Sequence, residues 1–356
     1  MNDNKIYFWL SLSSLTDKRL NALLDICSPK EIWDGITSSE SLKRFVGEKN
    51  VEMLVRFRNE SFLDRELAKI KERKVNILTR ADMRFPKSLL QREVCPPVIL
   101  YYKGDLNVLN APTVAIVGTR ACTTYGQEVA EMLARTLAKA GVTVVSGLAT
   151  GIDAYAHKEC LKAKGKTVAV LGGGLDHITP SSHRQLADEI EYSGLIVTQY
   201  PPSFVPTRYS FPERNRLIAG LSRGIIVVEA DAKSGALITA DYALEQGREV
   251  FAVPGNITSS RSKGTNRLIA QGAKLISSAE DVLTELRLNI PKKEKTVLPM
   301  LDFFEEKIYT LLQSGDKTIE ELIELSDLRA SDINSTLTGM EIKGIVVRIG
   351  NAYGVR

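Results

Sequence analysis

The stretch Thr113-Val114-Ala115-Ile116-Val117-Gly118-Thr119-Arg120 decides the fold expected for this chain. Its first five residues are apolar or β-branched and the run stops at a glycine, which is typical of a buried parallel strand that ends in a ligand-binding loop. A second run, 142–145, ends in the same way at Ser146-Gly147-Leu148-Ala149-Thr150-Gly151-Ile152-Asp153. Helical patterns follow both loops, so we expect backbone N–H groups and helix N-termini to face one phosphate-bearing ligand. Arg120 adds a cation that grips a phosphate with two hydrogen bonds.

Strand and helix patterns alternate from residue 113 to about residue 288. The predicted strands are 113–117, 142–146, 167–171, 195–198, 225–229, 249–253 and 274–276. Such alternation predicts an α/β fold with a mainly parallel, extended Rossmann-like sheet that is covered by helices on both faces. Several strands run into glycine-bearing loops. Because ligands bind outside the carboxyl ends of such strands, we expect these loops to line one crevice.

Smaller modules flank this domain on both sides. Short amphipathic helical patterns precede it, and two strand patterns, 75–78 and 98–102, lie in between. The predicted segments are a helical, SAM-like module (1–75), a connector (76–110), the Rossmann-like domain (111–288), a linker (289–300) and a C-terminal module (301–356).

The C-terminal module has the pattern of a winged helix. Two helical patterns precede a third, 332–342, which Ser331 is predicted to cap, and a hairpin follows around Gly350-Asn351. The module carries ten Asp and Glu against six Lys and Arg, and its third helix has no Lys or Arg. Because a net negative charge disfavours contact with phosphates, we expect a protein-contact or weak accessory role.

Composition excludes several classes of protein. No run of 18 apolar residues exists, so we expect no membrane contact, and the N-terminus lacks the pattern of a signal peptide, which favours the cytoplasm. Four scattered cysteines and three histidines show no metal-ligand spacing, so we expect no metal. The glycine loops carry no pair of nucleophile and base. We therefore expect no catalysis. A dinucleotide-dependent oxidoreductase would have Gly-x-Gly-x-x-Gly after the first strand, whereas the loop 118–123 has one glycine, so we expect no cofactor.

The order and spacing of several motifs carry a family resemblance. These motifs are Gly118 to Thr123, Ser146 to Asp153 with Ala156-His157, Gly172-Gly173-Gly174-Leu175-Asp176, Phe211 to Ser222, Ser234-Gly235-Ala236-Leu237, Gly247-Arg248 and Val253-Pro254-Gly255. Together they resemble the DNA-processing protein A (DprA, or Smf) family. The connector, with Phe85-Pro86 and Pro96-Pro97, resembles the same family.

The resemblance implies a protein that binds single-stranded DNA through its Rossmann-like domain and forms a homodimer through that domain. It implies protection of incoming strands and help in loading the RecA recombinase during natural transformation and homologous recombination. Thr119 stands where the family usually has Ser and keeps the hydroxyl group. The DNA-binding residues predicted from the motifs and the neighbouring cations are Gly118, Thr119, Arg120, Thr123, Gly147, Gly151, Gly173, Gly174, Arg184, Arg214, Arg216, Lys233, Lys263 and Arg267.

Some of these assignments leave alternatives open. Arg214 and Arg216 either contact the strand or make internal ion pairs, and we expect Asp153 to brace its loop or cap its helix rather than to act as a base. A nucleotide-binding or nucleotide-hydrolysing enzyme similar to the lysine-decarboxylase-like family is the alternative class. That family has Pro-Gly-Gly-x-Gly-Thr-x-x-Glu, whereas Pro254-Gly255-Asn256-Ile257-Thr258 has no second glycine and no following carboxylate.

Overall fold

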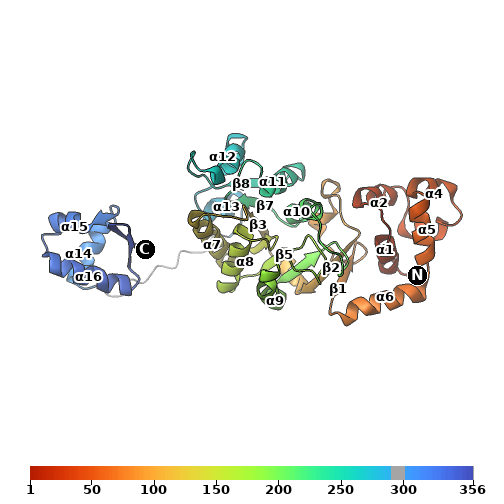
Figure 1. Ribbon diagram of the computed structural model, residues 1–356, viewed down its shortest axis with the longest axis horizontal. Helices are drawn as coiled ribbons and strands as arrows, with labels where there is room; N and C mark the ends of the chain where they lie inside the picture. The colour runs from red at the N-terminus through yellow and green to blue at the C-terminus, as the bar shows by residue number, and fades with distance from the viewer. Residues whose placement is uncertain (290–300, 356) are drawn as a thin grey trace. The chain divides into compact units, whose positions relative to one another are not determined.

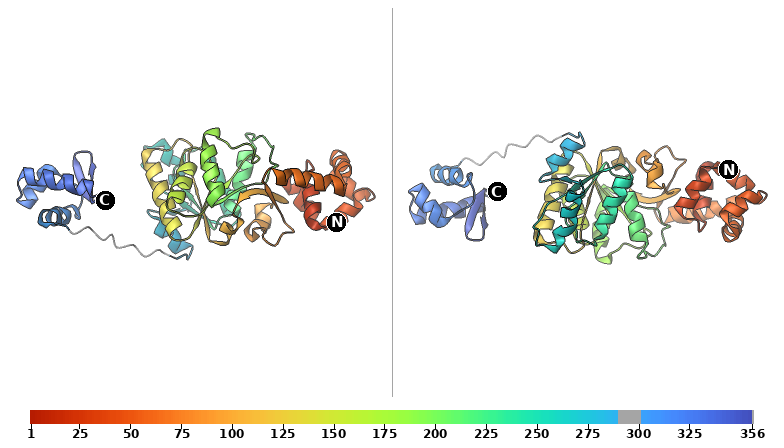
Figure 2. Two further views of the ribbon diagram at one scale, coloured as in Figure 1. Left: turned by 90° about the horizontal axis from the view of Figure 1, so that it is seen from below. Right: turned by 90° about the horizontal axis from the view of Figure 1, so that it is seen from above.

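The computed structural model describes residues 1–289 and 301–355. Within these ranges, residues 1–289 form one compact unit and residues 301–355 form a second, and each unit has its own apolar core. Figures 1 and 2 show both units from three sides. The predicted linker, 289–300, lies outside the described residues apart from Asn289.

A nine-stranded sheet forms the centre of the first unit (Figure 1). Its strands are β1 (Asn76–Thr79), β2 (Ile99–Gly104), β3 (Thr113–Val117), β4 (Thr143–Ser146), β5 (Thr167–Val170), β6 (Leu195–Thr198), β7 (Gly224–Val227), β8 (Glu249–Ala252) and β9 (Lys274–Leu275). They lie in the order β1-β2-β6-β5-β4-β3-β7-β8-β9. The β1–β2 and β2–β6 pairs are antiparallel and all other neighbours are parallel. The predicted, mainly parallel sheet is therefore confirmed.

Helices cover both faces of the sheet, because successive residues of each strand point to opposite faces. On one face, Val114 and Ile116 pack into a core with α7 (Thr124–Lys139), α8 (Ile152–Lys162) and α13 (Ala279–Glu285). On the other face, Ala115 and Val117 pack into a core with α10 (Ser210–Gly220), α11 (Gly235–Glu245) and α12 (Lys263–Ala270). Figure 1 shows α10, α11 and α12 on one side of the strands and α7, α8 and α9 (Arg184–Ser193) on the other.

The N-terminal helices belong to the same compact unit as the sheet. They are α1 (Asp3–Ser11), α2 (Asp17–Leu24), α3 (Pro29–Gly35), α4 (Glu40–Val46), α5 (Glu48–Phe57) and α6 (Glu60–Glu72). Their core includes Ile99 and Tyr101 of β2, so the predicted connector adds two strands to the sheet and gives the helices a surface to pack on. Helix α1 was missing from the sequence prediction. Its Ile6, Phe8, Trp9 and Leu10 are all buried, and a helix that is apolar on most sides has no amphipathic period.

The second unit combines three helices with a three-stranded antiparallel sheet. Its elements are α14 (Phe303–Leu312), β10 (Lys317–Thr318), α15 (Ile319–Ser326), α16 (Ala330–Ile342), β11 (Val346–Ile349) and β12 (Ala352–Val355), with sheet order β10-β12-β11. The predicted cap Ser331 is wrong, because Arg329 occupies the N-cap position and makes no side-chain cap hydrogen bond. The winged-helix assignment stays a prediction.

Within residues 1–289 and 301–355, no helix is both long enough and apolar enough to cross a bilayer.

Candidate functional site

The strand order reverses beside β3. After β3 the chain builds β4, β5 and β6 toward one edge of the sheet, and it then returns to place β7 on the other side of β3. Helix α7, which follows β3, and helix α11, which follows β7, pack on opposite faces of the sheet. The loops after β3 and β7 therefore diverge, and a crevice opens where ligands bind in open α/β sheets.

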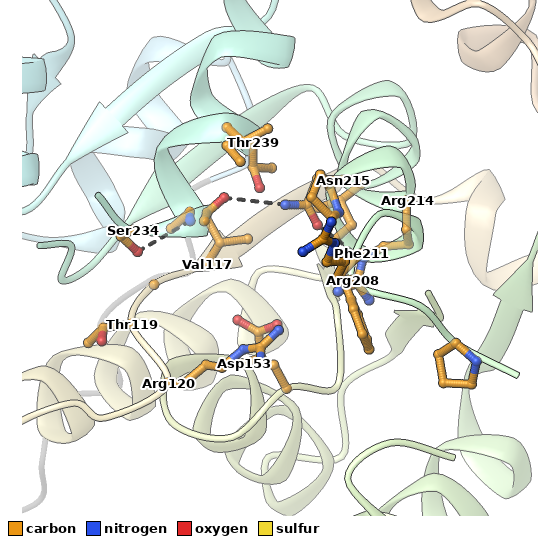
Figure 3. Close-up of a pocket in the computed structure, with 18 of the residues that line it drawn as sticks. Val117, Thr119, Arg120, Asp153, Arg208, Phe211, Arg214, Asn215, Ser234 and Thr239 are labelled. Carbon is orange, nitrogen blue, oxygen red and sulfur yellow. Dashed lines mark hydrogen bonds between the residues drawn. The ribbon is translucent and has the colours of Figure 1, made fainter. Parts of the chain in front are cut away.

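A pocket of about 670 Å³ lies at this reversal, and we call it the switch-point pocket. Its walls come from the loop after β3, the start of α10 and the start of α11 (Figure 3). Its charged lining residues are Arg120, Arg208, Arg214 and Asp153. This volume lies in the range of small-ligand sites.

Arg120 is the cation that the sequence analysis placed in this loop. Its side chain is exposed, lines the pocket and lies over the ring of Phe211, with 5.4 Å from the guanidinium carbon to the ring centroid. Among the described residues no carboxylate forms a salt bridge with Arg120. The stacked ring orients the guanidinium while its N–H groups stay available to a ligand. Figure 3 shows Arg120 and Phe211 facing the same hollow.

The helix N-terminus that faces the pocket differs from the expected one. We expected α7 to receive a phosphate, but the buried Glu229 carboxylate fills that place. It accepts hydrogen bonds from the Thr123 backbone N–H at 2.9 Å and the Thr123 hydroxyl at 2.6 Å. An anionic side chain already satisfies this end of α7. Thr123 is also the N-cap of α7, and we leave it out of the interface proposed below.

The helix N-terminus that faces the pocket is that of α11, not that of α7. Its N-cap Ser234 accepts a hydrogen bond from the Ala236 N–H, and Ser234, Gly235 and Ala236 all line the pocket. Gly235 is exposed, and an added Cβ would meet no atom within 4 Å. The positive end of the α11 dipole and the Arg120 guanidinium therefore border one cavity, which favours an anion.

Arg214 and Asp153 form the buried wall of the pocket. Arg214 is 4% exposed and donates to the Gly147 carbonyl at 2.8 Å and to the Val170 carbonyl. Burial lowers the pKa of Arg214 to about 10. Burial also raises the pKa of the Asp153 carboxyl, although Arg214 and the Gly147 N–H oppose this shift. Asp153 accepts from the Gly147 N–H at 3.0 Å, so it braces its loop as expected.

Arg216 lies outside the pocket. It is 6% exposed, and its guanidinium donates to the carbonyls of Val94 and Cys95, to Gln199 and to the Asp17 carboxylate. These contacts join α2 and the connector to α10. Because every partner is within the chain, we also leave Arg216 out of the proposed interface.

The predicted glycines allow close packing around the pocket. A Cβ on Gly118 would collide with Ile152, and one on Gly147 would collide with the Arg214 guanidinium. Gly151 has a φ of +76°, which disfavours other residues. The backbones of Gly173 and Gly174 are engaged by the Thr198 hydroxyl and the Phe204 carbonyl respectively. Only Gly118 of these five lines the pocket, so the others act by shaping the loops.

The remaining predicted cations are exposed and lie on three different elements: the loop before α11, helix α12 and the start of α9. Lys233 directly precedes the lining residue Ser234 and is exposed. Lys263 and Arg267 are exposed on α12, and Arg184 is exposed at the start of α9, where it donates to the Asp176 carbonyl at 3.4 Å. None of these four lines the switch-point pocket.

Sequence reasoning missed four contributors to the site. They are the lining residue Arg208, its exposed neighbour Tyr209, the ring of Phe211, and Arg261, which donates to the Thr119 hydroxyl at 3.3 Å. Phe211 begins the family motif 211–222, but the sequence alone indicated no role for its ring. Arg208 and Tyr209 lie two to three residues before the same motif, and their proximity to it was the available signal.

The described residues contain no cluster that resembles a metal centre. Across residues 1–289 and 301–355, no group of three or more His, Cys, Asp or Glu side chains is placed to hold a metal ion. The buried His157 donates from Nδ1 to the Thr167 hydroxyl at 2.7 Å, since that hydroxyl itself donates to the Val144 carbonyl. Burial lowers the pKa of His157 to about 3, so this ring is neutral at physiological pH.

Comparison with known proteins identifies the family. The family model described as DNA recombination-mediator protein A matches residues 76–287. The chain belongs to this family. It is 44% identical over 228 residues to the DNA processing protein DprA of Bacillus subtilis, a match that covers 63% of this chain and 75% of that one.

Two solved structures of family members extend the likeness to three dimensions. The X-ray structure of DprA from Streptococcus pneumoniae has a TM-score of 0.68 and 36% identity, and the match covers 80% of this chain and 98% of that one. A structure of DprA from Helicobacter pylori has a TM-score of 0.54 and 34% identity, with coverage of 60% and 96%. The latter was described for its single-stranded DNA binding mode.

Proposed function

We propose that this member of the DNA recombination-mediator protein A family binds single-stranded DNA in the switch-point pocket. The observation that carries the proposal is the exposed Arg120 guanidinium, which has no carboxylate partner in the described chain and borders the same cavity as the N-terminus of α11. A phosphodiester matches both groups, since it is an anion with oxygens that accept from a planar fork and from backbone N–H groups. The binding mode described for the Helicobacter pylori relative supports the same ligand.

The size of the pocket favours a single strand over a duplex. A cavity of about 670 Å³ admits a nucleotide-sized group, whereas paired and stacked bases stay inside a double helix. Arg120 and the N-terminus of α11 contact the phosphate backbone of the DNA. These contacts do not distinguish one base from another. We therefore expect binding without sequence preference.

Aromatic rings at the rim supply a second kind of contact. Tyr209 is 67% exposed and lies beside Arg208, whose guanidinium carbon is 4.6 Å from the Tyr209 ring centroid. Phe211 lines the pocket itself. Bases of a single strand stack on such rings, with about 1–3 kcal/mol per base. We propose Tyr209 and Phe211 as stacking positions beside the phosphate contacts.

The partners of the protein are proposed from family membership. We propose a homodimer formed through the Rossmann-like domain, protection of incoming strands in the cytoplasm, and help in loading the RecA recombinase during natural transformation and homologous recombination. We assign the acidic C-terminal unit a role in protein contact rather than in DNA binding, because its net charge disfavours phosphates. Sedimentation at several protein concentrations tests the dimer, and a monomer at all of them would exclude it.

One titration separates DNA binding from the enzyme alternative. Labelled single-stranded and double-stranded oligonucleotides of equal length are titrated with the full chain, and nucleoside monophosphate hydrolysis is followed in parallel. We expect tighter binding to the single strand and no hydrolysis. Equal affinity for both forms would refute the proposal, and turnover of the nucleotide would favour the lysine-decarboxylase-like class.

A further inference from the structure

A second pocket of about 530 Å³ lies where the amino ends of the parallel strands β3, β7 and β8 meet, opposite the carboxyl ends that border the switch-point pocket. Its lining includes Thr113 at the start of β3, Arg223 just before β7 and Arg248 just before β8. The carboxyl end of β3, Val117, lines the switch-point pocket instead. The two pockets are therefore separated by the length of a strand, and we call the second one the amino-edge pocket.

All charged side chains that line the amino-edge pocket are cationic. They are Arg84, Lys87, Arg223 and Arg248, and no Asp or Glu is among the residues that line it. The switch-point pocket, by comparison, includes Asp153 in its wall. Asp82 pairs with Arg84, so Lys87, Arg223 and Arg248 remain without a carboxylate partner in the described chain. These three cations around one cavity repel one another, and an anionic ligand relieves that repulsion.

The four cations differ in how firmly the chain holds them. Arg248 donates to the Gln91 side chain at 2.6 Å and to the Ser88 carbonyl at 3.2 Å, which fixes its orientation. Arg84 is paired with Asp82 at 2.6 Å. The charged groups of Lys87 and Arg223 are exposed and have no partner in residues 1–289 or 301–355. Two anchored guanidinium groups and two free cations thus border the cavity.

The rest of the lining suits a nucleotide. Hydrogen-bonding side chains come from Ser88, Asn107, Asn110 and Ser222, and apolar surface comes from Leu106, Leu109 and Met83, which is 96% exposed. Arginine forks and amide groups bind phosphate oxygens, and an apolar wall accepts a base. A cavity lined only by cations and amides would fit any small anion, but the apolar wall favours a ligand with a ring.

We propose that the amino-edge pocket is a second binding site for the phosphate group of a nucleotide. The nucleotide is either free, as a nucleoside triphosphate, or part of a single strand whose other segment occupies the switch-point pocket. The strand source rests on the proposed function, whereas the free-nucleotide source does not. Lys87 and Arg223 supply the contacts to phosphate, and Arg248 orients it.

The test uses the full chain with the switch-point pocket weakened by Arg120→Ala. In that background, fluorescently labelled adenosine triphosphate and labelled oligothymidylates, one short and one long, are titrated against three proteins. These are the background itself, the background with Lys87→Ala and Arg223→Ala, and a matched control with Arg65→Ala and Lys71→Ala. Arg65 and Lys71 are exposed cations on α6 that line neither pocket. Both pairs of changes remove two positive charges.

We expect the Lys87→Ala, Arg223→Ala protein to bind at least one probe about tenfold or more weakly than the control, as the loss of charge-assisted contacts predicts. Weaker binding of labelled adenosine triphosphate identifies a free nucleotide, and a loss confined to the long oligothymidylate identifies the strand. Equal binding of all three probes by the two double variants overturns the proposal.

Two further measurements keep the outcomes separate. Lys87→Arg with Arg223→Lys keeps both charges and should keep binding, and equal melting temperatures exclude unfolding as the cause of a loss. The function proposed for the switch-point pocket fails by a different result, namely unchanged single-strand affinity of Arg120→Ala alone in the otherwise unaltered chain.

Discussion

Replacement of Arg120 by Ala is the sharpest test of the switch-point pocket. The guanidinium is exposed and lacks a carboxylate partner in the described chain, so its removal leaves no buried charge behind. The fold loses the contact with the Phe211 ring, which at an exposed site stabilises by about 0.5–1 kcal/mol. We therefore expect the variant to fold and to unfold at nearly the same denaturant concentration.

The expected loss of binding is larger. A charge-assisted hydrogen bond to phosphate is worth roughly 1.5–3 kcal/mol, so Arg120→Ala should weaken single-strand binding by about tenfold to a hundredfold. One lost phosphate contact should also lower the magnitude of the salt slope by about 0.7 for each protomer. Fluorescence anisotropy of a labelled oligothymidylate at several salt concentrations measures both quantities.

Two matched variants sharpen the result. Arg120→Lys keeps the charge but loses the planar fork and the stack on Phe211, so it should keep the salt slope and lose part of the affinity. Arg65→Ala removes an exposed cation from α6 and should bind like the unaltered protein. If Arg120→Ala binds with unchanged affinity and slope, the pocket is not the DNA site. If it unfolds, Arg120 has a structural role instead.

Three further predictions concern stability and domain roles. Arg216→Ala should lower the free energy of unfolding by about 3–5 kcal/mol, because it strips Asp17 of its buried cation, and urea denaturation measures this. A stable Arg216→Ala protein with weakened DNA binding would instead make Arg216 a DNA contact. His157, with a pKa of about 3 when folded and an ordinary value of 6.5, binds fewer protons in the folded state than in the unfolded state between these values. Stability should therefore fall as the pH drops from 6.5 toward 3, by at most about 1.4 kcal/mol per pH unit. His157→Asn, which keeps a group at the Nδ1 position, should flatten this acid limb, and an unchanged limb would contradict the assignment. Finally, deletion of residues 297–356 should change single-strand affinity by less than about threefold, or ~0.7 kcal/mol, since this unit is acidic and has its own core. A hundredfold loss in the same anisotropy assay would show that the unit contacts DNA directly.

The order of strands and helices in the central domain was predictable because it depends on local pattern. The run 113–117 is β-branched and apolar and ends at a glycine, and it forms β3 over the predicted residues. Helix α1 was not predicted because its apolar residues lie on most sides of the helix. Its sequence therefore lacks the 3.6-residue repeat of apolar residues that marks an amphipathic helix. The exposed position of Arg120 beside the pocket was predictable because a cation at a strand end, next to a glycine turn, has few structural uses. Its contact with DNA stays a prediction.

Which cations are free was decided only by tertiary structure. Arg120, Arg214 and Arg216 look alike in the sequence, yet Arg120 is exposed, whereas the other two are buried against carbonyls and, for Arg216, a carboxylate from α2. The separation of Arg216 and Asp17 is 199 residues. A charge is neutralised by whatever the fold brings within a few ångströms, and no local pattern contains that information.

The amino-acid sequence by itself determined the strands, the glycine turns and the family motifs, because hydrophobic period and turn chemistry act over a few residues. Tertiary structure decided which strands are neighbours, and therefore where the crevice opens. It placed the Glu229 carboxylate, 106 residues away, on the N-terminus of α7 and left the N-terminus of α11 facing the pocket. Each helix offers the same N–H groups in isolation, and only long-range packing determines which of them remain available to a ligand.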